Sequence, residues 1–149
     1  MLSWLTENAI AARNRLTTEV KKFRNQEFME AVVAGCALVA ASDGNVSADE
    51  KKKMAGFIQN SDELRVFDMT QVIGAFNRAI EKFEFDEEIG RAEALRAIAK
   101  IGKKPDAARL LVRVCCAIGS ADGSFDEKEQ AVCRQICREL GLTPADFDL

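Results

Sequence analysis

Two short acidic turns carry most of the side chains in this sequence that could bind an ion. Residues 41–50 read ASDGNVSADE, and residues 120–129, which lie 79 positions further along, read SADGSFDEKE. Both turns gather oxygen-bearing side chains, which are the ligands that calcium, magnesium and manganese prefer. The candidate ligands are Asp43, Asn45, Ser47 and Glu50 in the first turn and Asp122, Ser124, Asp126 and Glu129 in the second.

The ligand spacing matches the start of an EF-hand calcium loop but does not complete it. Positions one, three and five agree, whereas Ala48 and Glu127 stand where that loop has its glycine. Met54 and Cys133 stand where it has its final glutamate. The turns are therefore not EF-hands, and we expect a metal bound here to occupy a weak site or one shared between the turns.

The same residues also have a purely structural interpretation. The glycine of each turn suits the left-handed conformation at a helix end, and Ser47 and Asp126 each precede a glutamate by three residues, as in a capping box. Asp43 and Asp122, however, fall at the carboxyl ends of predicted helices, where the helix dipole disfavours an anion. Each therefore needs a compensating partner, of which a bound cation is one candidate.

Catalytic chemistry is poorly represented in the chain. It contains no histidine and no tyrosine, which excludes a Ser–His or Cys–His site. No glycine-rich phosphate loop accompanies the carboxylates, so we predict no catalytic residue and no enzyme. A third acidic cluster is interpreted as a solvated helix start, or else as a third source of carboxylate ligands or a partner-facing surface; it comprises Glu84, Asp86, Glu87 and Glu88.

The five cysteines and the charge distribution indicate an intracellular protein. Cys36, Cys115, Cys116, Cys133 and Cys137 lie in apolar stretches without CxxC spacing, as reduced, buried thiols do. The alternative is a thiol cluster for a soft metal. No signal peptide or membrane-spanning run is expected. The net charge of −3 argues against a nucleic-acid partner, although residues 1–25 alone carry +3.

Helical periodicity predicts the elements that position these side chains. We expect an all-α fold of about seven helices in a single domain over residues 1–149, with no strand. In the helix that follows the acidic cluster, the predicted buried face is Ile89, Ala92, Leu95, Ile98 and Ala99. The expected helices cover approximately residues 5–23, 28–41, 48–58, 69–83, 87–99, 105–118 and 127–140.

The second acidic turn belongs to a longer internal repeat. Shifted by 79 positions, Cys36 falls on Cys115 and Phe57 falls on Ile136, and both turns stay in register. Each copy reads as a buried helix, an Asp-Gly turn and a capped amphipathic helix. We predict that hairpin 28–60 superposes on hairpin 107–140 and that the two pack as a bundle with approximate twofold symmetry.

These motifs together resemble the TerB family of tellurite-resistance proteins. The resemblance rests on the order of ASDG, VSADEKKKMAGFI, SDELRVFD, FEFDEEIG and SADGSFDEKE, and it covers essentially the whole chain. It implies an all-helical bacterial cytoplasmic protein made of two related halves. It also implies a stress-response system whose other members bind membranes and metals.

Two functional hypotheses follow. The first is a non-enzymatic interaction or scaffold module of a tellurite-resistance complex, whose acidic turns bind a divalent cation or face a basic partner. The second is a metal-responsive regulator, or a protein that sequesters metal or tellurite through its thiols. The expected partners are proteins of that complex, some of them membrane-associated, with this protein cytoplasmic or peripheral at the inner membrane. The basic first helix, which begins with Leu2, Trp4 and Leu5, packs on its own bundle or docks on anionic lipid.

Overall fold

The computed structural model describes residues 9–44, 46–121 and 123–149. Within these ranges the chain forms seven α-helices, two short 3₁₀ helices and no strand, which confirms the predicted all-α fold. The elements are α2 (Ala9–Lys22), α3 (Gln26–Ala40), α4 (Ala48–Gln59), η1 (Asp62–Leu64), α5 (Met69–Phe85), α6 (Glu87–Ala99), α7 (Pro105–Gly119), α8 (Glu127–Glu139) and η2 (Pro144–Phe147).

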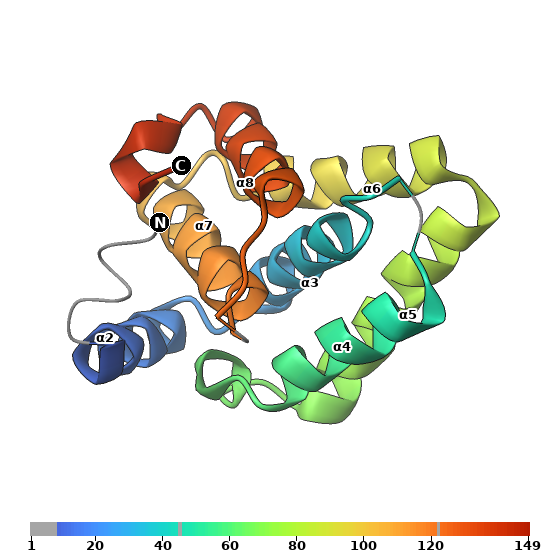
Figure 1. Ribbon diagram of the computed structural model, residues 1–149. Helices are drawn as coiled ribbons and strands as arrows, with labels where there is room; N and C mark the ends of the chain where they lie inside the picture. Colours follow the sequence, from blue (N-terminus) through green and yellow to red (C-terminus); the bar gives the residue numbers. More distant parts are fainter. Residues whose placement is uncertain (1–8, 45, 122) are drawn as a thin grey trace.

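Two apolar helices, α3 and α7, form the centre of the molecule (Figure 1). Helix α3 is buried from Ala31 to Ala40 and contacts five other α-helices, α4 to α8. Gly35 allows α7 to approach closely, since a Cβ atom there would lie 2.4 Å from the Cys115 sulfur. The sequence predicts this core because both helices are apolar on nearly every side.

Helices α5 and α6 form an outer hairpin whose corner is Asp86. This residue ends α5 and also caps α6, because its carboxylate accepts a hydrogen bond from the Ile89 amide at 3.1 Å. The predicted buried face of α6 is wrong in part: Ile89 is 45% exposed, Ala92 and Ala99 are exposed, and Leu95 is half-buried. Gly90, Ala94 and Ile98 are buried instead. Small residues lie inward because α6 packs closely on both α3 and α5.

Helix α2 packs on the bundle through Ala12, Leu16 and Val20, as one of the two interpretations of the basic first helix predicts. Its Arg13 pairs with the fully buried Glu63 of η1 at 2.9 Å. The predicted helix start at Leu5, together with Leu2 and Trp4, lies outside the described residues.

The two halves of the repeat share local geometry. Helices α3 and α7 begin and end 79 positions apart, and so do the starts of α4 and α8. Gly44 has a φ of 96° and Gly123 a φ of 80°, so both adopt the left-handed conformation expected of them. Each glycine amide donates to a carbonyl three residues earlier at 3.0 Å. The superposition of hairpin 28–60 on 107–140, and the overall twofold symmetry, stay predictions.

Candidate functional site

The structure brings side chains of the two acidic turns to one cavity of about 130 Å³. Asp43 and Glu50 enter it from the α3–α4 hairpin, and Asp126 and Glu129 enter it from the α7–α8 hairpin. Lys53 of α4 also lines the cavity, beside an apolar wall. Residues about 79 positions apart therefore share one site, and we call it the acidic cavity.

Helix capping fixes two of the four carboxylates. The Asp126 carboxylate accepts from the Glu129 amide at 2.8 Å, and the Glu129 carboxylate accepts from the Asp126 amide at 3.2 Å. This is the predicted capping box in full. In the first turn the structure shows one of the two hydrogen bonds of a capping box: the Ser47 hydroxyl accepts from the Glu50 amide at 3.1 Å. The capping prediction is thus confirmed at α8 and in half at α4.

Asp43 has a compensating partner from the other hairpin. Lys128 of α8 places its Nζ 3.1 Å from Asp43 Oδ1. The pKa of Lys128 is raised because its ammonium donates to this carboxylate and is attracted by its charge. The unfavourable position of Asp43 at a helix end is therefore offset by a lysine. Both side chains are well exposed, so water and salt screen the pair.

Glu129 is the carboxylate that the cavity perturbs most clearly. Its pKa is raised, chiefly because partial burial disfavours the charged form and also because the Asp126 charge is near. The hydrogen bond from the Asp126 amide and the charge of Lys53 act in the opposite direction. Burial is therefore the main reason why the charged form of Glu129 is disfavoured in this cavity.

Not every predicted ligand reaches the acidic cavity. Asn45 and Asp122 lie outside the described residues, and Ser47 and Ser124 are exposed residues that do not line it. Among the residues that the structure describes, no group of three or more acidic or thiol side chains is already close enough to hold a metal. An ion bound here would have to draw the carboxylates together.

Two lysines of this site were missed by the sequence interpretation. Lys53 and Lys128 come from different hairpins. In the other copy of the repeat, Val132 stands at the position of Lys53 and Asp49 at the position of Lys128. The repeat therefore gave no signal for them. Their role depends on how the hairpins pack, which a local pattern does not contain.

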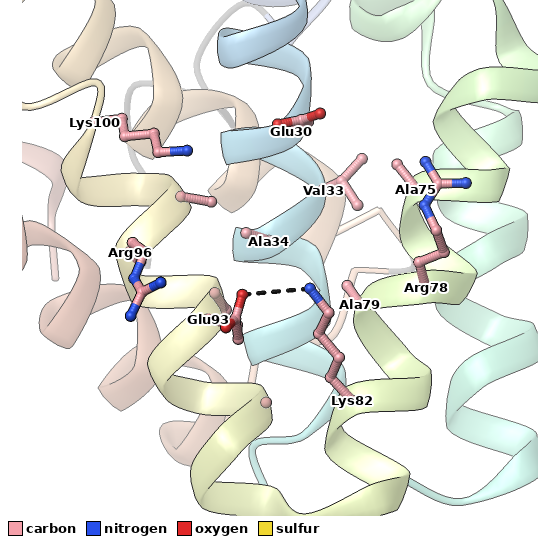
Figure 2. Close-up of a pocket in the computed structure, with 13 residues that line it drawn as sticks. Glu30, Val33, Ala34, Ala75, Arg78, Ala79, Lys82, Glu93, Arg96 and Lys100 are labelled. Atoms are coloured by element: carbon pink, nitrogen blue, oxygen red, sulfur yellow. Dashed lines mark hydrogen bonds and ion pairs between the residues drawn. The ribbon is translucent and has the colours of Figure 1, made fainter.

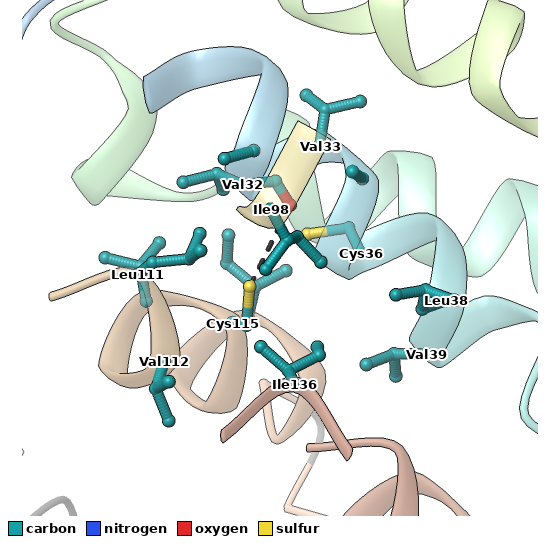
Figure 3. Packing of buried hydrophobic residues seen from close by; sticks show 14 of the residues in the cluster. Val32, Val33, Cys36, Leu38, Val39, Ile98, Leu111, Val112, Cys115 and Ile136 are labelled. Carbon is teal, nitrogen blue, oxygen red and sulfur yellow. Dashed lines mark hydrogen bonds between the residues drawn. The ribbon is translucent and has the colours of Figure 1, made fainter. Parts of the chain in front are cut away.

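The five cysteines are free and buried, as predicted. Figure 3 shows the sulfur atoms of Cys36 and Cys115 among aliphatic side chains, with Cys115 donating to the Val32 carbonyl at 3.9 Å. The pKa of Cys115 is raised well above its usual value by its contact with Cys36 and by burial. Burial raises the pKa of Cys137 to about 12. Cys115 and Cys137 are therefore protonated at neutral pH, which makes them poor nucleophiles and metal ligands in the folded protein.

The third acidic cluster surrounds an exposed apolar pair. Phe85 is 81% exposed and Ile89 is 45% exposed at the corner between α5 and α6. Glu87 pairs with Arg91 at 3.1 Å within α6, while Glu84 and Glu88 are exposed. The exposure of these carboxylates at the start of α6 fits a solvated helix start and also fits a partner-facing surface, so both interpretations stay open.

Glu129 gives the acidic cavity a testable pH dependence. We expect Glu129→Gln to be more stable than the native protein at pH 7, with the difference vanishing in acid. A raised pKa means that the folded protein binds this proton more tightly than the unfolded chain does. The free energy of unfolding therefore falls as the pH rises from about 4.5, the ordinary pKa of a glutamate, through the raised pKa of Glu129 in the folded protein. Glutamine keeps the capping acceptor without the charge.

Urea unfolding of both proteins at pH 7 and pH 4 measures this difference. A stability difference that stays constant, or grows in acid, would contradict the assigned direction of the shift.

Comparison with known proteins agrees with these features. The family model described as "Tellurite resistance protein TerB" matches residues 29–149. A protein of Alcaligenes sp named "Tellurium resistance protein TerB" is 42% identical over 104 residues, which span 70% of this chain and 85% of that protein. No solved structure matches the chain. Within the described part of the chain, no helix is long and apolar enough to span a membrane.

Proposed function

Because this chain belongs to the TerB family of tellurite-resistance proteins, we propose that it is a non-enzymatic interaction module of a bacterial tellurite- and stress-resistance system. We further propose that its two acidic turns form one shared site for a divalent cation. The proposed location is the cytoplasm or the inner face of the inner membrane. The proposed partners are other proteins of the same system.

The convergence of both turns on the acidic cavity is the observation that carries the proposal. Four carboxylates from two hairpins line it together with one cationic side chain, that of Lys53. Calcium, magnesium and manganese are hard cations that bind carboxylate oxygens. Calcium also tolerates several coordination geometries. It would compete with Lys128 for Asp43, and release of Lys128 is part of the proposed binding step.

A cation at this position would link the two hairpins. The acidic cavity lies where the α3–α4 and α7–α8 turns meet, so an ion bound to carboxylates of both turns would add a link between the two hairpins to the ion pair of Lys128 with Asp43. Occupancy would change the charge that this end of the molecule presents to a partner. The interaction role and the metal-responsive role are in this way two aspects of one site.

Divalent ions are expected to raise the melting temperature of the native protein. A ligand that binds only the folded state at ten times its dissociation constant contributes about 1.4 kcal/mol, or roughly 3 to 6 °C for a chain of this size. The variant Glu50→Gln/Glu129→Gln should lose this gain, because glutamine closes a capping box but binds hard cations poorly. Thermal unfolding with and without low-millimolar calcium, magnesium or manganese measures the effect.

The matched control is Glu81→Gln/Glu88→Gln, which removes the same charge from two exposed positions on α5 and α6. It should keep the full ion-dependent gain. If the native protein shows no gain with any of the three ions, the cation site is wrong and the acidic turns are caps and partner-facing surface. If a response to tellurite or a soft metal survives in Glu50→Gln/Glu129→Gln, sequestration through the thiols is the better function.

A further inference from the structure

A second cavity lies over α3, between α5 and α6. It shares no lining residue with the acidic cavity. Its volume is about 220 Å³, and Figure 2 shows α3 running between the two outer helices with Ala34 at the centre of the floor. Many of the residues that line the cavity have small side chains, which leave space between the helices, and the long side chains stand around its edge. The small residues lining it are Ala34, Ala75, Ala79, Gly90, Ala94 and Ala97.

Four cationic side chains surround this hollow, which we call the basic groove. Arg78 and Lys82 lie four residues apart on α5. Arg96 of α6 and Lys100, the residue that follows the last residue of α6, are also four apart, so each pair lies along one side of its helix. Two carboxylates also line the groove, which leaves an excess of two positive charges. The whole chain carries −3, so the positive charge is a local feature.

In the part of the chain that the structure describes, three of the four cations have no ionic partner. Lys82 reaches from α5 to Glu93 of α6, with 3.3 Å between Nζ and Oε2 (Figure 2). Among the described residues, Arg78, Arg96 and Lys100 make no side-chain hydrogen bond or ion pair, and Lys100 extends from α6 toward α3 in the same view. Cations gathered around a hollow repel one another, and a bound anion removes that repulsion.

We propose that the basic groove binds a small polyvalent anion that carries two adjacent phosphate groups. Lysines supply point charges for phosphate, arginines supply paired donors, and a floor of alanine and glycine lets the ligand approach the helices closely. The volume of about 220 Å³ suits a diphosphate group. Nucleic acid is disfavoured because the net charge of the chain is negative.

The proposal does not depend on the acidic cavity. That cavity is lined by the α3–α4 and α7–α8 turns, whereas the basic groove is lined by the middle of α3 and by α5 and α6. One site takes cations and the other takes anions. Failure of either proposal therefore leaves the other standing.

Isothermal titration calorimetry in metal-free buffer with sodium pyrophosphate tests the groove. The native protein should bind with release or uptake of heat at low-millimolar pyrophosphate or below, and more weakly as salt is added. The variant Lys82→Gln/Lys100→Gln should bind at least tenfold more weakly. The matched control Lys103→Gln/Lys104→Gln removes the same charges from the exposed α6–α7 connection and should change the affinity less than twofold.

A gain-of-binding variant makes the test independent of folding defects. Glu93→Gln removes the carboxylate that now pairs with Lys82, so pyrophosphate affinity should rise about two- to fivefold. A parallel titration with ADP distinguishes the source of the diphosphate: tighter binding of ADP indicates a nucleotide, and equal binding indicates that the diphosphate group suffices. Absence of pyrophosphate binding, or equal losses in the groove and control variants, would overturn the proposal.

Discussion

Replacing Gly90 by alanine is expected to destabilise the protein by about 2 to 3 kcal/mol, although alanine is intrinsically the better helix residue. A Cβ atom at this position would lie 2.7 Å from both the amide nitrogen and the Cα of Phe83, and 2.6 Å from the ring of the same residue. Backbone atoms cannot rotate away as the end of a side chain can. The hairpin of α5 and α6 would have to open to admit the methyl group, which would disturb the walls of the basic groove.

Gly56→Ala is the matched control, because it makes the same substitution inside α4. A Cβ atom there would meet nothing within 4 Å. This variant should be more stable than the native protein by about 0.5 to 1 kcal/mol, the usual helix preference for alanine over glycine. Urea denaturation of the three proteins measures both values. Equal stabilities for the two alanine variants would show that α5 and α6 separate without cost.

Local capping chemistry explains why most helix boundaries could be predicted from the sequence. Asp68 accepts hydrogen bonds from two amides at the start of α5, and Pro105 opens α7 where its missing amide costs nothing. Asp126 and Glu129 form the capping box of α8. Each of these features depends on residues within four positions of one another, so the sequence contains the whole interaction.

The face of α6 could not be predicted in this way, because burial there depends on the distance between helices. Periodicity assigned the large apolar Ile89 to the core, yet it is 45% exposed while Gly90 is buried. A helix that packs closely against two neighbours buries its smallest residues. That closeness is set by α3 and α5 and is absent from the pattern of α6 itself.

The candidate site shows the same division between local and long-range information. The repeat identified Asp43, Glu50, Asp126 and Glu129 as a related set, and these four residues line a common cavity. The expectation of a weak metal site, or one shared between the turns, stays a prediction. The sequence did not indicate that Lys128 pairs with Asp43, because this contact crosses 85 positions between hairpins. It also gave no reason to connect the cations of α5 with those of α6.

Removal of Arg13 is expected to have the largest effect among single substitutions of charged residues, with a loss of about 3 kcal/mol. Glu63 is fully buried, and Arg13 Nη1 lies 2.9 Å from its Oε1. Its other carboxylate oxygen accepts from the Ser61 hydroxyl at 2.7 Å. The guanidinium also reaches the Ala117 carbonyl at 3.5 Å, so one side chain joins α2, η1 and α7. The variant Arg13→Met keeps the apolar stem but leaves the carboxylate buried without its cation.

Glu63→Gln provides the complementary change, because glutamine still accepts from Ser61 but carries no charge to neutralise. We expect Arg13→Met/Glu63→Gln to recover about 2 kcal/mol of the loss, since the cost of Arg13→Met comes mainly from the stranded charge. Urea unfolding of the native protein, the two single variants and the double variant completes the cycle. Additive losses would mean that Arg13 acts through packing alone. A recovery would establish that this charge pair anchors helix α2 to the bundle.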